Sequence, residues 1–370
     1  MRIVHIDTAC ELRGGQHQLL LLARGLHARG HQQMIVCPES SALGTRARRE
    51  QFRVFDLSAH DPAHVHGILQ VRQSLLAEPA DIIHAHDGKG QTIARLACLG
   101  IPARPRTVAS RRVTFAPARS WSTRLKYGWA CDGVIAVSES IRSRLLEAGV
   151  RAHKIQLIPD GLEAPADLPG EELRAASRAA WGFDTNEFVT GHVGAFTAEK
   201  GQDIAVDAMK LLWGELPQVR LVLAGNFPTR ATVLTRTIKS QLLQGGNRIR
   251  LLGYLEDLTP FFAALDLYIM PSRAEGLGSS ALIAMAHGVP VVAARVGGLP
   301  EIVEPGRTGW LVEAESPRAL AEAVRCAASD PRRLRQFGNR ARERAQEFSS
   351  DKMVARTEAF YNRLLTGSLN

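Results

Sequence analysis

Short runs of apolar residues recur along the chain, and each is followed by a turn and then by a segment with helical periodicity. Many of the residues in these runs are β-branched. Parallel strands that are covered by helices on both faces typically appear as such continuous apolar runs. In the first part of the chain the runs lie at 2–7, 33–38, 52–57, 81–86, 106–110, 133–138 and 155–161. This pattern predicts a doubly wound α/β domain.

The alternation stops once, in a segment rich in proline, alanine and acidic residues (LEAPADLPG, 162–170), and then restarts. The later runs lie at 188–196, 219–225, 249–254, 267–272, 290–294 and 309–313. We therefore expect two Rossmann-like doubly wound domains that face a cleft, over residues 1–165 and 166–349. Residues 350–370 have helical periodicity, with Met353, Phe360 and Tyr361 on an apolar face. We expect this helix to cross back to the first domain.

Composition narrows the class of protein. The 370 residues are 45% hydrophobic and 22% charged, as in soluble globular proteins. No apolar run approaches the roughly 20 residues that would cross a bilayer, and the first residues lack the features of a secretion signal. We expect a cytoplasmic protein. The five cysteines lie far apart and mostly in apolar segments, so we expect reduced thiols rather than disulfides or a zinc site.

The net charge of +9 favours anionic partners such as nucleotides, phosphorylated lipids, an acidic membrane face or nucleic acid. Arginine outnumbers lysine, which a codon bias would also produce. The basic stretch 106–130 (RTVASRRVTFAPARSWSTRLKYGWA) contains Arg111 and Arg112 and interleaves cations with aromatic residues. We expect these two arginines to meet an anionic acceptor or the anionic membrane face; a solvated surface is the alternative. No nucleic-acid recognition motif accompanies them.

Ligands of doubly wound sheets bind beyond the carboxyl ends of the strands, so motifs at these ends carry the most weight. The first is ELRGGQHQ, in which Gly14 and Gly15 allow close approach to the backbone at a helix start that favours anions. A tight turn is an equally good reading. The second is IIHAHDGKGQ, which places His84, His86 and Asp87 at a strand end. A metal ligand, a contact to a sugar hydroxyl and a structural histidine all remain open.

The third and fourth motifs lie in the second domain. In GHVGAFTAEKGQD, Lys200 beside a helix start can neutralise a departing phosphate, although an ordinary exposed lysine has the same pattern. In PSRAEGLGSSALIAMAHG, the residues Gly276, Gly278, Ser279 and Ser280 offer amides and hydroxyls at a helix N-terminus, which suits a diphosphate. Glu275 precedes them and can accept hydrogen bonds from sugar hydroxyls.

In this order the motifs resemble the retaining glycosyltransferases of the GT-B fold, the family 4-like group with many bacterial lipopolysaccharide, capsule and lipid glycosyltransferases. The resemblance spans nearly the whole chain and includes GVIAVSESIRSRLLEAGV, IPDGLE, LVLAGNFP, IRLLGYLEDLTPFFAALDLYIMPSRAEGLG, AMAHGVPVVAARVGGLPEIV and GRTGWLVE. It implies transfer of a glycosyl group from a nucleotide diphosphate sugar, with UDP as the expected nucleotide, to a glycan or glycolipid acceptor. It also implies that no metal ion or other cofactor takes part.

The resemblance assigns roles to individual positions. His86 would lie near the transferred sugar, Lys200 would grip the diphosphate, and Glu275 would bind sugar hydroxyls. The remaining donor-binding positions implied are Gly14, Gly15, Gly194, Gly225, Gly253, Tyr254, Leu255, Gly276, Leu277, Gly278, Ser279 and Ser280.

Two positions depart from the family pattern. Ile283 stands where a second acid usually holds the ribose, and Ala195 stands where an arginine usually follows the VG of the third motif. Loss of one charge-assisted contact typically costs about 1.5 to 3 kcal/mol, which weakens binding without abolishing it. We therefore expect an active enzyme. A non-catalytic nucleotide-sugar-binding relative and an epimerase that needs no acceptor are the alternatives.

Overall fold

The computed structural model describes residues 1–58, 65–112, 127, 131–227 and 233–367. The chain divides into two compact units. Unit 1 comprises Met1–Gly161 together with Ser350–Asn370, and unit 2 comprises Leu162–Ser349. None of the helices in the described ranges is both long and apolar enough to cross a membrane.

Unit 1 is built on a parallel sheet whose strand order, in the described residues, is β3-β2-β1-β4-β5-β6-β7. The chain runs outward from β1 to β3 and then returns to add β4 on the other side of β1, so the order reverses between β1 and β4. The strands are β1 (Arg2–Ile6), β2 (Gln32–Pro38), β3 (Arg53–Leu57), β4 (Ile82–Ala85), β5 (Arg106–Arg111), β6 (Gly133–Ala136) and β7 (Ile155–Leu157).

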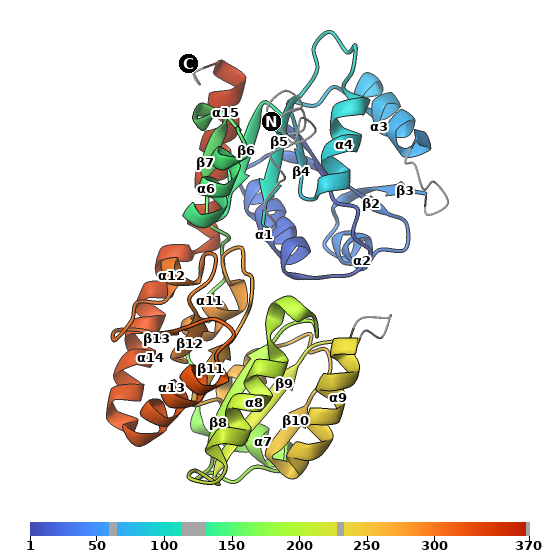
Figure 1. Cartoon of the computed structure of the whole chain (residues 1–370). Helices are drawn as coiled ribbons and strands as arrows, with labels where there is room; N and C mark the ends of the chain where they lie inside the picture. Colours follow the sequence, from blue (N-terminus) through green and yellow to red (C-terminus); the bar gives the residue numbers. More distant parts are fainter. Residues whose placement is uncertain (59–64, 113–126, 128–130, 228–232, 368–370) are drawn as a thin grey trace. The chain divides into compact units, whose positions relative to one another are not determined.

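Helices cover this sheet, and the last helix of the chain is one of them (Figure 1). It contributes Met353, Phe360 and Tyr361 to a buried cluster with Leu22 and Ile82. The last helix therefore packs into the core of unit 1. Within the described residues, the helices of unit 1 are α1 (Gly14–Ala28), α2 (Ala42–Arg49), α3 (Val65–Ala77), α4 (Gly88–Ala97), α6 (Glu139–Glu147), the short η2 (Ala152–Lys154) and α15 (Ser350–Thr366).

Unit 2 repeats this architecture with the strand order β10-β9-β8-β11-β12-β13, again parallel throughout the described residues. The order reverses between β8 and β11. The strands are β8 (Phe188–Val193), β9 (Val219–Ala224), β10 (Ile249–Leu251), β11 (Leu267–Met270), β12 (Val291–Ala294) and β13 (Gly309–Val312). The predicted α/β class, with two doubly wound parallel sheets, is confirmed.

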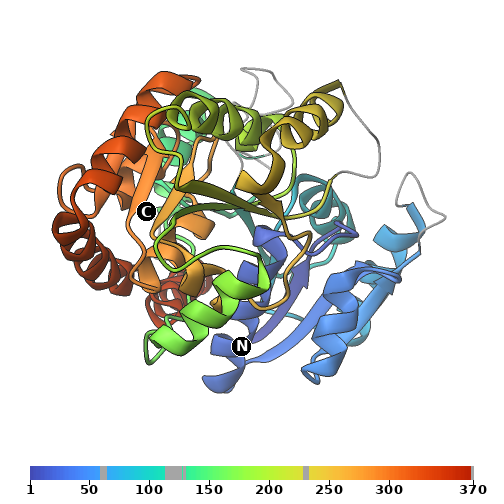
Figure 2. The same ribbon diagram turned by 90° about the horizontal axis from the view of Figure 1, so that it is seen from below.

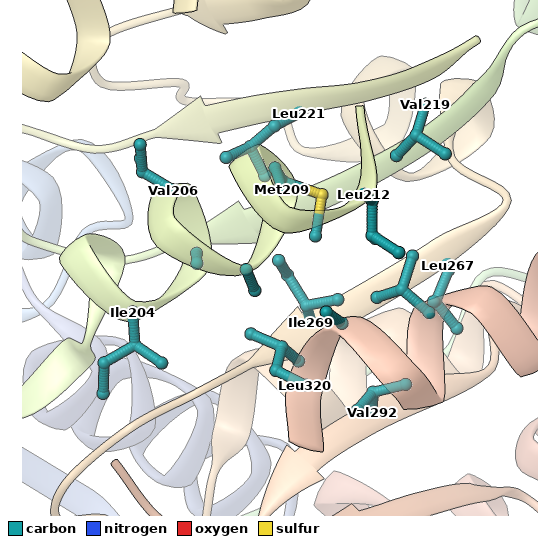
Figure 3. Close-up of a cluster of buried hydrophobic side chains, with 14 of the residues drawn as sticks. Ile204, Val206, Met209, Leu212, Val219, Leu221, Leu267, Ile269, Val292 and Leu320 are labelled. Atoms are coloured by element: carbon teal, nitrogen blue, oxygen red, sulfur yellow. The ribbon is translucent and has the colours of Figure 1, made fainter. Parts of the chain in front are cut away.

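The core of unit 2 forms where α8 and α13 pack on the sheet (Figure 3). Met209 and Leu212 of α8 meet Leu267 and Ile269 of β11 there. In the turned view of Figure 2, α8 and α9 lie side by side over the sheet. The helices are α7 (Glu171–Ala180), η3 (Ala198–Lys200), α8 (Gln202–Leu212), α9 (Val233–Gly245), η4 (Gly246–Arg248), α10 (Thr259–Ala264), α11 (Ser279–Ala286), α12 (Leu299–Ile302), α13 (Pro317–Ser329), α14 (Pro331–Ala345) and η5 (Gln346–Phe348).

Candidate functional site

The carboxyl ends of β1 and β4, where the strand order of unit 1 reverses, bring buried histidines together. His5 of β1 and His84 of β4 are fully buried, and His86 follows β4 with 7% of its surface exposed. Burial lowers the pKa of His5 to about 4, and it also holds the pKa values of His84 and His86 well below their usual range. The positive charge of Arg112 acts in the same direction on all three. These rings are therefore neutral at pH 7.

A chain of hydrogen bonds fixes the tautomers of two of these rings. The amide nitrogen of Gln33 donates to the carbonyl of Ala23 (2.7 Å), so Gln33 Oε1 accepts from His5 Nε2 (3.0 Å). A neutral His5 then has a lone pair at Nδ1, to which His86 Nε2 donates (3.1 Å). His86 Nδ1 in turn accepts from Arg112 Nη1 (3.2 Å). Both ring nitrogens of His86 are thus engaged within unit 1.

Both ring nitrogens of His84 lie within hydrogen-bond distance of protein hydroxyl groups. Its Nδ1 lies 2.6 Å from the hydroxyl of Tyr361 in α15, and its Nε2 lies 2.8 Å from Ser110 Oγ. Ring nitrogens of His5, His84 and His86 lie within 4.8 Å of one another, as in a metal site. All six of these nitrogens already have a hydrogen-bond partner, and the cationic Arg112 adjoins the cluster. A metal ion would have to break these bonds, so the arrangement fits a hydrogen-bonded network better than a cation site.

Arg112, the residue after β5, is held in a fixed orientation. Its Nε donates to Asp160 Oδ1 (2.8 Å) while Nη1 donates to His86, and 13% of its side chain is exposed. Among the described residues, none accepts a hydrogen bond from its Nη2. Arg111 points its guanidinium at Tyr127 instead, with Nη1 donating to the phenolic oxygen (3.1 Å). The cations and aromatic residues at 113–126 and 128–130 of the basic stretch lie outside the described residues.

The loop after β1 leaves space beside its two glycines. A Cβ atom at Gly14 or Gly15 would meet nothing within 4 Å, so packing within the protein does not require glycine at either position. Nearby, Gln16 Nε2 donates to both carboxylate oxygens of Asp7 (3.1 and 3.0 Å), and burial raises the pKa of Asp7. Asp87 caps α4 by accepting from the Gly90 amide (2.6 Å), which gives this acid a structural role.

Unit 2 brings Lys200 and Glu275 together from loops that are far apart in sequence. Lys200 ends η3, directly after the β8 loop, and Glu275 follows β11. Lys200 Nζ donates to Glu275 Oε1 at 2.5 Å, and Ser272 Oγ donates to the same oxygen at 3.1 Å. The carboxylate is 9% exposed and the lysine 28%. The sequence motifs placed both residues at strand ends, and the structure joins them in one ion pair.

Two further features hold this pair in place, and the sequence reasoning missed the first. Arg273 donates to both oxygens of Asp203 (3.0 and 2.8 Å) and to the Ala198 carbonyl (2.8 Å), which ties the β11 loop to η3 and α8. Gly201 has a φ of 68°, and a Cβ atom there would lie 2.1 Å from the Pro271 carbonyl oxygen. The two partners of the Arg273–Asp203 ion pair lie far apart in the sequence, so no local pattern could have revealed this contact.

The N-terminus of α11 directly follows Glu275. Gly276, Leu277 and Gly278 are buried, whereas Ser279 and Ser280 are half-buried. No side chain caps this helix, so its first amides are not satisfied by a protein side chain. Gly278 has a φ of 105°.

The loops after β8, β9 and β10 meet one another. The amide of Gly225 donates to the Gly253 carbonyl (2.6 Å). A Cβ atom at Gly225 would lie 2.0 Å from the Gly194 oxygen, so glycine is required there. Tyr254 is 49% exposed and Leu255 half-buried. The implied donor-binding positions of the second half of the chain therefore gather at one edge of the sheet of unit 2, while Gly14 and Gly15 belong to unit 1.

The two departures from the family pattern are both partly accessible. Ile283 lies on α11 and Ala195 follows Gly194, and each is half-buried. The structure therefore has no carboxylate at the first position and no guanidinium at the second.

Comparison with known proteins gives consistent matches over both halves of the chain. The family model described as "Glycosyltransferase Family 4" matches residues 12–164, and the model described as "Glycosyl transferases group 1" matches residues 174–344. Alpha-maltose-1-phosphate synthase of Mycolicibacterium smegmatis is 29% identical over 320 residues, which cover 78% of this chain and 80% of that protein. N-acetyl-alpha-D-glucosaminyl L-malate synthase of Bacillus anthracis is 28% identical over 327 residues, which cover 86% and 84%.

Among solved structures, Anabaena HepE, crystallised with UDP and glucose, superimposes with a TM-score of 0.87. The alignment covers 97% of this chain and 99% of HepE, at 24% sequence identity. This likeness shows a shared fold.

Proposed function

Because this chain belongs to the glycosyltransferases described by these two family models, we propose that it moves a sugar from a nucleotide diphosphate sugar to an acceptor hydroxyl, with retention of the anomeric configuration. The observation that carries the proposal is the Lys200–Glu275 pair beside the uncapped N-terminus of α11. A cation, free amides and a carboxylate at one strand edge are the groups that a sugar diphosphate requires.

In this proposal unit 2 binds the donor. The Lys200 ammonium and the amides from Gly276 to Ser280 stabilise the diphosphate, and their effect grows as negative charge develops on the leaving group. Glu275 accepts hydrogen bonds from the hydroxyls of the transferred sugar. The exposed Tyr254 and its neighbours Gly253 and Leu255 lie at the base, with UDP as the favoured nucleotide. The protein itself supplies the positive charge, so we propose that no metal ion takes part.

Unit 1 binds the acceptor, and Arg112 is the residue proposed to recognise it. A guanidinium held by Asp160 and His86 is oriented to present its remaining N–H groups to an anion. His86 therefore acts by positioning Arg112. The names of both relatives describe products with an anionic group, a phosphate in one and malate in the other. A phosphate-bearing glycolipid meets the same requirement, so we propose a role in cell-envelope glycan or glycolipid synthesis, in the cytoplasm or at the inner membrane face.

The test is a donor screen by thermal shift and calorimetry with UDP-sugars and GDP-sugars, followed by assays for released nucleotide. A donor present at a hundred times its dissociation constant adds about 2.7 kcal/mol of stability. Nucleotide release that needs both donor and acceptor, and that persists in EDTA, supports the proposal. Tight binding without turnover would instead favour the non-catalytic alternative, to which Ile283 and Ala195 point. Conversion of the donor without any acceptor would indicate an epimerase.

A further inference from the structure

His192, the penultimate residue of β8, has a buried ring nitrogen without a partner. The residue is fully buried, and its Nδ1 donates to the Ile269 carbonyl of β11 (3.0 Å). A carbonyl can only accept, so Nδ1 carries the proton and a neutral ring has its lone pair at Nε2. No residue in the described part of the chain forms a hydrogen bond with this Nε2. A buried acceptor left unsatisfied is costly and needs an explanation.

The unpaired nitrogen and the side chain of Lys200 both face Gly194. A Cβ atom at Gly194 would lie 3.4 Å from His192 Nε2 and 3.5 Å from both Cγ and Cδ of Lys200. His192 Nε2 and the side chain of Lys200 therefore flank the same point beside Gly194. In the function proposed above, this is where the diphosphate of the donor binds.

The groups that face His192 explain why its ring is neutral before a ligand arrives. Burial, followed by the positive charge of Lys200, lowers its pKa to about 4, although the bond to Ile269 opposes this. The ring stacks on Tyr268 (centroids 6.0 Å apart), whose own pKa is raised by burial, so this phenol is also neutral. Glu275, the nearby acid, is paired with Lys200.

The arrival of a diphosphate changes this balance. Its two negative charges would meet one lysine, already shared with Glu275, while Arg273 is committed to Asp203 and Glu315. We propose that His192 takes up a proton from solvent at Nε2 when a diphosphate binds beside Gly194, and that its imidazolium then acts with Lys200 as a second cation. Nδ1 keeps its bond to Ile269, so the ring needs no rotation. This inference rests on the proposed function.

The test is calorimetry of UDP, and of GDP in parallel, at about pH 7.5 in buffers that differ in ionisation enthalpy. The slope of the binding enthalpy against that ionisation enthalpy gives the number of protons taken up. Wild-type protein is expected to take up a large fraction of one proton and to bind UDP more tightly as the pH falls from about 8.5 to 6. His192→Asn keeps a donor for the Ile269 carbonyl but cannot be protonated. It should lose the proton uptake and bind UDP about tenfold or more weakly.

A rescue experiment separates charge from packing. Ala195 is half-buried and directly follows Gly194, so Ala195→Arg places a permanent cation nearby. In the Ala195→Arg, His192→Asn double variant, UDP affinity should recover without recovering its pH dependence. His192→Gln replaces the Asn variant if the latter does not fold.

The outcomes distinguish the two proposals. If neither UDP nor GDP binds to the wild-type protein, the proposed function is overturned. Binding without proton uptake by wild-type protein, or with uptake that persists in His192→Asn, would overturn the inference about His192 and leave the proposed function standing.

Discussion

Lys200 Nζ and Glu275 Oε1 lie 2.5 Å apart, so the cation proposed to hold the diphosphate and the carboxylate proposed to hold the sugar neutralise one another in the unliganded protein. Each group is thereby kept oriented at the strand edge without a ligand. A bound sugar diphosphate would replace this ion pair with two new contacts. Lys200 would contact a phosphate, and Glu275 would contact the sugar hydroxyls. Nucleotide and sugar should therefore respond differently to changes in the pair.

The Glu275→Gln substitution separates the contribution of this pair to nucleotide binding from its contribution to sugar transfer. Removal of the carboxylate charge frees Lys200 for the diphosphate, so UDP should bind as well as before or a few-fold more tightly. Sugar transfer should fall about tenfold to a hundredfold, as expected for the loss of a charge-assisted hydrogen bond. Calorimetry and a released-nucleotide assay measure the two effects. Glu322→Gln, an exposed glutamate on α13 paired with Arg325, is the matched control. Unchanged transfer in Glu275→Gln would show that this acid does not contact the sugar.

Arg112→Gln tests the acceptor side. The acceptor KM should rise about tenfold or more, because a guanidinium held by two partners loses its contact to an anion. UDP affinity should stay the same. Arg111→Gln is the control, since Arg111 faces Tyr127. A defect in vesicle binding, with normal use of a soluble acceptor, would assign Arg112 to the membrane instead. Equal effects of the two substitutions would contradict the distinct role of Arg112.

Acid should destabilise the protein well before its carboxylates titrate. The folded pKa values of His5 and His192 are about 4, below the usual histidine value of about 6.5. As the pH falls, the histidines of the unfolded chain therefore take up protons before those of the folded protein. The stability that the two neutral histidines contribute to the fold is fully present above about pH 6.5 and is lost as the pH falls toward 4. Each such histidine contributes a slope of about 1.4 kcal/mol per pH unit in this window. Urea denaturation at about pH 7.5, 6.5 and 5.5 measures this slope, and a flat profile would mean that folding does not lower the pKa values of these histidines.

Gly201→Ala tests the loop that carries Lys200. The left-handed backbone and the Pro271 carbonyl oxygen leave no room for a methyl group, so the substitution should cost about 1 to 3 kcal/mol of stability and displace Lys200. UDP affinity should fall with it. Gly214→Ala is the control, because a Cβ atom there meets nothing within 4 Å. Thermal denaturation with and without UDP measures both effects, and a variant that matches wild type would refute the strain at Gly201.

Much of this architecture could be predicted from local patterns, because buried parallel strands are continuous apolar runs and strand ends follow directly from them. The positions of His86, Lys200 and Glu275 at strand ends were predictable on this basis. Their partners were not. Gln33 and Arg273 look like ordinary polar residues in the sequence, and only the register of β1 with β2 and the packing of the β11 loop bring them to His5 and Asp203.

His192 illustrates the same limit. Its neighbours in sequence, Gly191 and Val193, do not indicate a role for it, and the unpaired Nε2 emerges only when β11 supplies the partner for Nδ1. The sequence likewise left a metal-binding role open for His84 and His86. One contact that argues against this role comes from Tyr361, which bonds His84 from the other end of the chain.

UDP binding to wild-type protein and to Lys200→Ala, measured by calorimetry, most directly tests whether a sugar diphosphate is held at the strand edge of unit 2. Lys210→Ala on α8 removes a half-buried lysine that pairs with Asp207, and it serves as the control. We predict that wild-type and Lys210→Ala proteins bind UDP alike, and that Lys200→Ala binds it about tenfold to a hundredfold more weakly, as expected for a lost charge-assisted contact. Equal affinity of wild-type and Lys200→Ala proteins for UDP would contradict this placement of the donor.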